Sequence, residues 1–112
     1  MKRGEVWVGN MNPARGAEVG KSRPVLVMQA DQLMDQLGTV VVLPLTSQSS
    51  HELGLIRIPI PARERLDDDS FVLVEQPRSL DKRKFGEGPL TRLTEDEMLR
   101  VEKGFKIALS LY

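Results

Sequence analysis

The chain has 112 residues, with sixteen basic and sixteen acidic side chains and a formal net charge of zero. This length favours one domain with a single core, and we expect residues 1–112 to form it. Without net charge, no overall field attracts the protein to nucleic acid or an acidic membrane, so nucleic-acid binding requires a local basic patch. The absence of cysteine excludes disulfides, thiolate zinc sites and a cysteine nucleophile.

No part of the sequence predicts targeting or membrane insertion. The chain begins Met-Lys-Arg-Gly-Glu, without an apolar stretch, so we expect no secretory signal. No apolar run reaches the length of a membrane-spanning helix. The simplest expectation is a cytoplasmic protein with no membrane partner.

Short segments rich in aliphatic and β-branched residues predict strands along most of the chain. The strongest is 39–46, where Pro44 predicts an edge or a bulge near the end. A nearly continuous apolar run at 24–29 predicts a strand buried on both faces or within a small barrel. Pro59 indicates an edge strand, with Arg57 on its outer face. Strands are also expected at 6–8, 55–60, 70–76 and 90–93.

Helical signals are few and concentrate near the C-terminal end. Thr94-Glu95-Asp96-Glu97 is a capping box, and apolar residues then recur at three- and four-residue spacing: Met98, Val101, Phe105, Ala108 and Leu109. Gly104 within this helix predicts a close backbone contact. A helical turn at 31–35, capped by Asp31, and a turn or short helix at 77–84 are also expected. The pattern predicts a mainly β, strongly bent sheet or barrel with a C-terminal α-helix.

A polar loop with two glycines, residues 12–24, separates the first two predicted strands. Asn12-Pro13 opens a turn, and the glycines allow backbone conformations that a β-carbon disfavours. Arg23 precedes Pro24, which favours an extended backbone and places the guanidinium at a strand start. Considered alone, such a loop is more often a solvated hairpin than a site.

Several common site types are missing from the sequence. The single histidine, His51, lies in a polar loop, and the carboxylates lack the spacing of metal ligands, so we expect no metal and no cofactor. Serine-hydrolase motifs and phosphate loops of the Walker or dinucleotide type are absent. Asp67-Asp68-Asp69 is interpreted as a solvated acidic run. His51 is interpreted as an exposed residue, with a substrate contact as the alternative.

Polar residues at the predicted strand ends form the remaining candidate site. In a small barrel, strand ends meet at one rim. A guanidinium supplies fork-shaped donors for phosphate oxygens, and a threonine hydroxyl adds another donor. Such a rim suits stabilisation of a phosphoryl transition state without a metal. The residues concerned are Arg15, Glu18, Arg23, Thr46, Ser47, Gln48, Glu75 and Gln76.

Short motifs follow one another from residue 3 to about residue 111. They are Arg3-Gly4-Glu5-Val6-Trp7, Asn12-Pro13, Gly16-Ala17-Glu18, Gly20, Arg23-Pro24-Val25-Leu26-Val27, Pro44-Leu45-Thr46-Ser47, Glu75-Gln76-Pro77-Arg78-Ser79-Leu80-Asp81 and Leu93-Thr94-Glu95-Asp96-Glu97-Met98. This ordered set resembles the MazF/PemK/Kid toxin endoribonucleases. The resemblance implies an SH3-like, partly open β-barrel, a homodimer, and metal-independent cleavage of single-stranded RNA at short sequences.

The resemblance also implies a mechanism, in which a 2′-hydroxyl attacks the adjacent phosphorus and leaves a 2′,3′-cyclic phosphate and a 5′-hydroxyl. Arg23 corresponds to the family's catalytic arginine, Thr46 to its catalytic threonine, and Glu18 to a loop carboxylate implicated in some members. Because a guanidinium stays protonated, we assign Arg23 to stabilising the charged phosphorane. Thr46 would hold a non-bridging oxygen, and Glu18 is our candidate for the general base.

Two positions depart from the Kid branch of the family. Ala17 stands where that branch has a histidine, and Leu73 stands where it has an arginine, so its acid–base scheme does not transfer intact. Glu75 falls at the position of a functional aspartate in that branch. We expect substrate contacts from Arg15, Lys21, Ser47, Gln48, Glu75, Gln76 and Arg78.

The resemblance further implies a cognate antitoxin whose acidic, disordered C-terminal segment covers the RNA groove, because a basic groove also binds such a segment. Trp7 is interpreted as a core residue, with base stacking as the alternative. The apolar stripe of the C-terminal helix is expected to serve the core, a dimer interface or both.

Two other functions compete with RNA cleavage. One is a non-catalytic, protein-binding toxin of the same fold, of the CcdB gyrase-poison type. That branch relies on a C-terminal Trp-Gly-Ile, where this chain ends Ala-Leu-Ser-Leu-Tyr. The other is an SH3-like module for proline-rich peptides, which needs an aromatic-lined groove. One tryptophan, one tyrosine and three phenylalanines supply little for such a groove.

Overall fold

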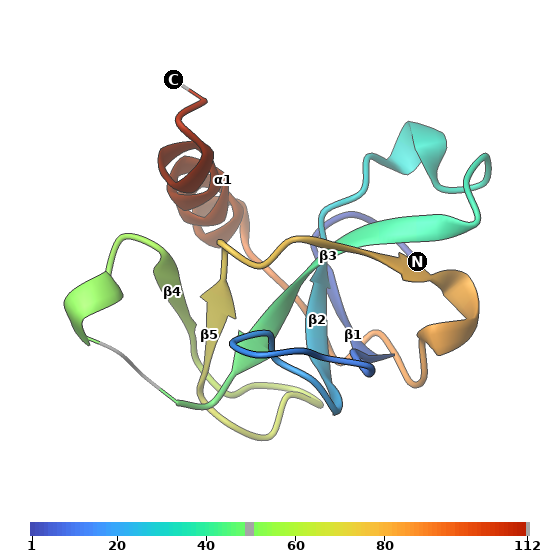
Figure 1. Cartoon of the computed structure of the whole chain (residues 1–112), viewed down its shortest axis with the longest axis horizontal. Helices are drawn as coiled ribbons and strands as arrows, with labels where there is room; N and C mark the ends of the chain where they lie inside the picture. Colours follow the sequence, from blue (N-terminus) through green and yellow to red (C-terminus); the bar gives the residue numbers. More distant parts are fainter. Residues whose placement is uncertain (49–50, 112) are drawn as a thin grey trace.

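In the computed structural model, the described residues 1–48 and 51–111 form one curled antiparallel sheet of seven strands and a C-terminal helix (Figure 1). The strands are β1 (Glu5–Asn10), β2 (Ser22–Val27), β3 (Thr39–Thr46), β4 (Arg57–Ile60), β5 (Ser70–Leu73), β6 (Arg78–Asp81) and β7 (Thr91–Arg92). The helix α1 spans Glu95–Leu109, and 3-10 turns occupy Asp31–Leu33, His51–Leu53 and Lys82–Lys84. The side chain of His51 lies outside the described part, and so does the substrate contact considered for it.

Strand β3 is the centre of the sheet, whose order is β4-β5-β3-β2-β1-β7 with β6 also paired to β3. On one side β3 pairs with β2, and on the other it pairs first with β6, through Val42, and then with β5, from Leu45 onward. Pro44 is buried at the point where β3 has left β6 and has not yet met β5. Of the edge or bulge expected at Pro44, the edge is wrong, because β3 is a central strand and a change of partner accommodates the missing N–H.

Residues of β2 and β3 alternate between two apolar clusters, one on each face of the sheet. Leu26 and Leu43, which face one another across the two strands, belong to the cluster that also contains Val101 of α1. Their neighbours Val27 and Val42 belong to the second cluster, which Trp7 covers. The predicted mainly β, partly open barrel with a C-terminal helix is confirmed, as is burial of β2 on both faces.

The helix α1 follows its predicted start closely. The Glu97 N–H donates to Thr94 Oγ1 at 3.1 Å and the Thr94 N–H donates to Glu97 Oε1 at 2.9 Å, which confirms the capping box. A β-carbon on Gly104 would lie 2.7 Å from the Leu55 carbonyl oxygen, so the predicted close contact is confirmed. The apolar stripe ends early, because Ala108 and Leu109 are exposed beyond the sheet.

Three other local expectations differ from the structure. Segment 77–84 contains strand β6 before its short helical turn, because residues 39–42 of β3 supply a partner for a sequence with little β character. Asp31 does not cap its turn: Ala30 is the N-cap, and Asp31 Oδ1 accepts the Arg3 N–H at 2.8 Å. The strands expected at 55–60, 70–76 and 90–93 are each shorter than predicted.

Strand β4 lies at one end of the sheet order, which confirms the edge position indicated by Pro59. Arg57 of this strand is half-buried and forms an ion pair with Glu75. Within residues 1–48 and 51–111, we find no helix with the length and hydropathy needed to cross a bilayer.

An ion pair connects the loop after β4 to the first turn of α1. Arg63 Nη2 and Nη1 donate to the two carboxylate oxygens of Glu97 at 2.6 and 2.8 Å, and Arg63 Nε donates to Thr91 Oγ1 at 3.2 Å. The hydrogen bond from Arg63 lowers the pKa of Glu97, and the Thr94 N–H contributes in the same direction. The 61–69 loop is thereby held to the helix.

We predict that Glu97→Gln lowers the free energy of unfolding at pH 7 by about 2 kcal/mol, because it leaves a half-buried guanidinium without its charged partner. Since folding lowers the pKa of Glu97, the stabilisation is complete above the unfolded carboxyl pKa and is lost as pH falls through the folded value. The difference between wild type and variant should therefore shrink below about pH 4.3. Urea unfolding across pH measures it.

Asp96→Asn is the matched control, because it removes an exposed carboxylate from the same helical turn, where it pairs with Arg100. We expect a loss below about 1 kcal/mol for this variant. A Glu97→Gln deficit of the same size at pH 3 and pH 7 would contradict the proposed contribution of the ion pair.

Candidate functional site

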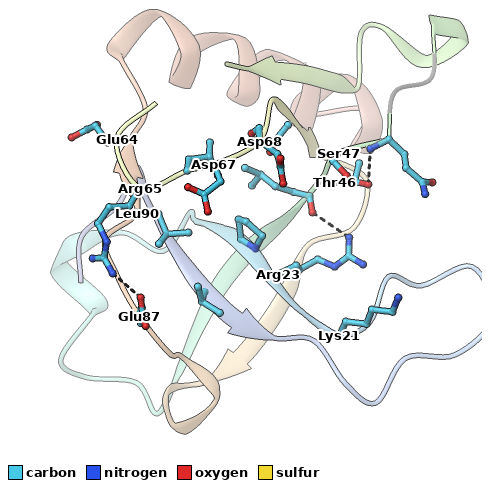
Figure 2. Close-up of a pocket in the computed structure, with 16 residues that line it drawn as sticks. Lys21, Arg23, Thr46, Ser47, Glu64, Arg65, Asp67, Asp68, Glu87 and Leu90 are labelled. Atoms are coloured by element: carbon cyan, nitrogen blue, oxygen red, sulfur yellow. Dashed lines mark hydrogen bonds and ion pairs between the residues drawn. The ribbon is translucent and has the colours of Figure 1, made fainter. Parts of the chain in front are cut away.

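A groove of about 810 Å³ lies along the ends of β2 and β3 and beneath the 61–69 loop (Figure 2). It collects residues from five separate segments of the chain. Its lining is Val8, Lys21, Arg23, Pro24, Leu45, Thr46, Ser47, Gln48, Glu64, Arg65, Leu66, Asp67, Asp68, Ser70, Glu87 and Leu90. We call it the Arg23 groove.

Arg23 stands near the start of β2, opposite Gly9 of β1. Its Nε donates to the Gly20 carbonyl at 2.8 Å and its Nη1 donates to the Leu45 carbonyl at 3.2 Å. Figure 2 shows the guanidinium directed toward the end of β3, near Thr46. Partial burial lowers the pKa of Arg23, but a guanidinium remains charged in proteins. The backbone thus fixes a cation whose other N–H donors remain available to a ligand.

Thr46 is the last residue of β3 and pairs with Phe71 of β5. Its Oγ1 accepts the Gln48 N–H at 3.2 Å, which turns the chain away from the sheet. Because the oxygen is the acceptor in this bond, the hydroxyl proton is available to donate elsewhere. Arg23 and Thr46 therefore present N–H and O–H donors in the same groove.

The two ends of the Arg23 groove have opposite charge. Lys21 is exposed at the cationic end, next to Arg23. Glu64 lines the other end, and Asp67 and Asp68 line the wall across from Arg23, with Asp68 near Thr46 in Figure 2. At the Glu64 end, Arg65 Nη2 donates to Glu87 at 2.7 Å, so its charge is compensated. The groove offers a short cationic stretch rather than a uniformly basic surface.

The acidic wall of the groove, formed by Glu64, Asp67 and Asp68, was not part of the site expected from the sequence. Asp67 and Asp68 are exposed, as a solvated run should be, yet they line the groove. Arg65 and Glu87 reach it because the Arg65 N–H donates to the Leu90 carbonyl at 2.9 Å. This contact joins two segments far apart in sequence, and no local pattern signals it.

A second groove, of about 560 Å³, separates the β1–β2 loop from residues 75–78. Glu18, Glu75, Gln76 and Arg78 all line it. In this groove, Glu18 Oε1 accepts the Arg15 N–H at 2.7 Å and Glu75 pairs with Arg57. These carboxylates therefore have partners of their own, away from the Arg23 groove.

The expected single rim is thus two grooves in the structure. Lys21, Arg23, Thr46, Ser47 and Gln48 come together in the first, and Glu18, Glu75, Gln76 and Arg78 in the second. Arg15 is exposed on the loop between β1 and β2. In the part of the chain that the structure describes, no group of three or more histidine or carboxylate side chains is arranged to hold a metal ion.

Solved structures of MazF toxins and of mycobacterial endoribonucleases share this fold. A MazF from Deinococcus radiodurans superimposes with a TM-score of 0.84 at 24% identity, over 98% of this chain and 96% of that one. The Mycobacterium tuberculosis toxin MazF-mt6 superimposes with a TM-score of 0.79 at 17% identity, over 95% and 96%. A mycobacterial endoribonuclease in complex with its cognate antitoxin gives 0.80 at 18% identity, over 100% and 97%.

The sequence also matches a family of such toxins. Residues 2–109 match the model of the PemK-like, MazF-like toxins of type II toxin–antitoxin systems. The chain belongs to this toxin family, which confirms the resemblance drawn from its motifs.

Proposed function

We propose that this protein is an endoribonuclease that cleaves single-stranded RNA at short sequences without a metal ion. The observation that carries the proposal is the pair of donors in the Arg23 groove, the Arg23 guanidinium and the Thr46 hydroxyl. Each is held by hydrogen bonds with the backbone. Preorganised donors of this kind stabilise charge that develops in a transition state. Membership of the family supports the reaction class.

In the proposed reaction the RNA 2′-oxygen forms a bond to the adjacent phosphorus and the bond from phosphorus to the 5′-oxygen breaks. The 2′-hydroxyl proton passes to a base, and the departing 5′-oxygen gains a proton, so the products are a 2′,3′-cyclic phosphate and a 5′-hydroxyl. Arg23 donates to the phosphorane oxygens and neutralises their added charge. Thr46 donates to a non-bridging oxygen.

Glu18 is our proposed general base. Its carboxylate accepts the Arg15 N–H and lies in the second groove. A role in proton transfer therefore requires the tip of the β1–β2 loop to carry Glu18 toward the Arg23 groove when RNA binds, while the base of the loop stays in place. Gly16, with φ of 57°, lies in this tip.

We propose an orientation for the substrate from the charges that line the groove. Phosphates would lie on the Lys21–Arg23 side, since the carboxylates of Glu64, Asp67 and Asp68 repel them from the facing wall and the other end. The acidic wall then faces bases or riboses. Single-stranded RNA suits this arrangement because its bases are free to turn toward side chains. Arg15, Ser47 and Gln48 are exposed nearby on the same loops and complete the proposed substrate contacts.

We also propose a cognate antitoxin, a homodimeric assembly and a cytoplasmic location. Two solved structures support the antitoxin: MazE–MazF from Deinococcus radiodurans and a mycobacterial endoribonuclease in complex with its cognate antitoxin. An acidic, disordered antitoxin segment would compete with RNA phosphates for Lys21 and Arg23. Exposed Leu99 and Leu109 on α1 supply apolar surface for a second copy.

We predict that the purified protein cuts a long single-stranded RNA in excess EDTA, and that Arg23→Met lowers the single-turnover rate by about 100-fold or more. Thr46→Val keeps the side-chain shape, removes one donor, and should cost about tenfold or more. Gel analysis of labelled RNA measures the rates, and end mapping identifies the cyclic phosphate.

Arg100→Met provides a control, because it removes an exposed cation from the far helix. Its rate should equal that of wild type. Absence of cleavage, or equal cleavage by wild type and Arg23→Met, would overturn the ribonuclease proposal. Gyrase inhibition without RNA cleavage would favour the protein-binding alternative.

A separate prediction concerns Glu18. If its carboxylate takes the 2′-hydroxyl proton, Glu18→Gln should slow cleavage by about 100-fold and remove the acidic limb of the pH–rate profile. Glu52→Gln, in the loop after β3, is a matched loss of an exposed carboxylate. A Glu18→Gln enzyme with the wild-type rate at every pH would exclude Glu18 as the base.

A further inference from the structure

The loop between β1 and β2, residues 11–21, is held by side chains from one other segment of the chain. Arg78 Nη1 donates to the Met11 carbonyl, and Arg78 Nη2 donates to the Pro13 carbonyl at 3.4 Å. Lys84 Nζ donates to the Asn12 carbonyl at 2.6 Å. Two cations thus bind three consecutive carbonyl oxygens at the start of the loop. Charged donors make hydrogen bonds about twice as strong as neutral ones.

A third side chain of the same segment holds the far side of the loop. Gln76 Oε1 accepts the Val19 N–H at 3.1 Å. We call Gln76, Arg78 and Lys84 the loop clamp. Arg78 stands on β6 opposite Val42 of the central strand β3, so the clamp is anchored on the most buried part of the sheet.

Two residues that the clamp holds, Met11 and Asn12, are bonded through other atoms to Lys21, shortly before Arg23. The Met11 N–H donates to the Lys21 carbonyl at 2.9 Å, and the Lys21 N–H donates to Asn12 Oδ1 at 2.9 Å. The carbonyl of Gly20, the residue before Lys21, accepts a hydrogen bond from Arg23 Nε at 2.8 Å. A shift of residues 11–13 would therefore move an acceptor that orients the Arg23 guanidinium.

Packing makes this connection stiff. A β-carbon on Gly20 would lie 2.7 Å from Asn12 Oδ1 and 2.9 Å from the Ala14 β-carbon. The two ends of the loop are thus in van der Waals contact at Gly20. Lys21 has a φ of 68°, an unusual value for a residue with a β-carbon, which the surrounding hydrogen bonds maintain.

We propose that Arg78, supported by Lys84, is a positioning residue that fixes the base of the β1–β2 loop and, through Gly20, the orientation of Arg23. Both Nη groups of Arg78 are directed at loop carbonyls rather than at the Arg23 groove. This role differs from the RNA contact expected from the sequence. Its catalytic consequence rests on the proposed ribonuclease function, whereas its structural consequence does not.

The test compares Arg78→Met, Arg78→Lys and Lys84→Met with Arg83→Met. Arg83 is the matched control, since it lies in the same segment, is exposed and pairs with Asp81. Three quantities are measured: the single-turnover cleavage rate, the salt dependence of binding to RNA with a 2′-deoxy group at the cut site, and amide hydrogen exchange of residues 11–21.

We expect Arg78→Met to slow cleavage by about tenfold or more, because small displacements of a catalytic group have large effects on rate. The slope of log K against log salt should stay at the wild-type value. Amides of Met11 and Lys21, which are bonded between the two ends of the loop, should exchange about tenfold faster, since residues 11–13 lose their support. Arg78→Lys and Lys84→Met should be intermediate, and Arg83→Met should match wild type.

A direct phosphate contact by Arg78 would give a different result. Removing one such contact reduces the salt slope by about 0.7 for a single strand. That reduction with unchanged exchange of the loop would overturn the positioning role, as would a wild-type cleavage rate in Arg78→Met. If wild type cleaves no RNA, the proposed function fails, and unchanged loop exchange in a folded Arg78→Met protein would still overturn the clamp.

Discussion

The burial of β3 on both faces is the constraint on which the rest of the structure depends. Its alternating residues fill two apolar clusters, and its edges pair with β2, β5 and β6. Moving this strand would open both clusters at once. The Leu45 carbonyl and the Thr46 hydroxyl at its end are therefore rigid, and β6 carries Arg78 from the same support. The packed core thus fixes the positions of the groups at the end of β3.

A chain with no net charge can keep a locally basic region because its cationic side chains have two different kinds of partner. Arg57, Arg63 and Arg65 pair with carboxylates, which compensate their charge. Arg23, Arg78 and Lys84 instead donate to backbone carbonyls, which are neutral acceptors. Their positive charge is thus retained around the β1–β2 loop. Selective compensation, rather than composition, creates the local field that binding to phosphate requires.

Local patterns predicted the features that a single residue type or a short motif signals directly. The capping box at Thr94, the close contact at Gly104 and the edge position of β4 are all present. Patterns failed where a distant partner decides the outcome. Residues 78–81 form a strand because β3 offers them an edge, and Asp31 binds the Arg3 N–H instead of capping its own turn. Tertiary contacts overrode weak local preference in both cases.

The sequence by itself determined the toxin family, the mainly β class and the candidate residues Arg23 and Thr46, because ordered motifs and strand propensities are written in consecutive residues. Only the tertiary structure decided which candidate residues lie in the same groove. It separates Glu18 and Glu75 from the Arg23 groove, adds the acidic wall, and directs Arg78 to the loop carbonyls. These relations join segments tens of residues apart, and their distances follow from how the sheet curls, which no local pattern encodes.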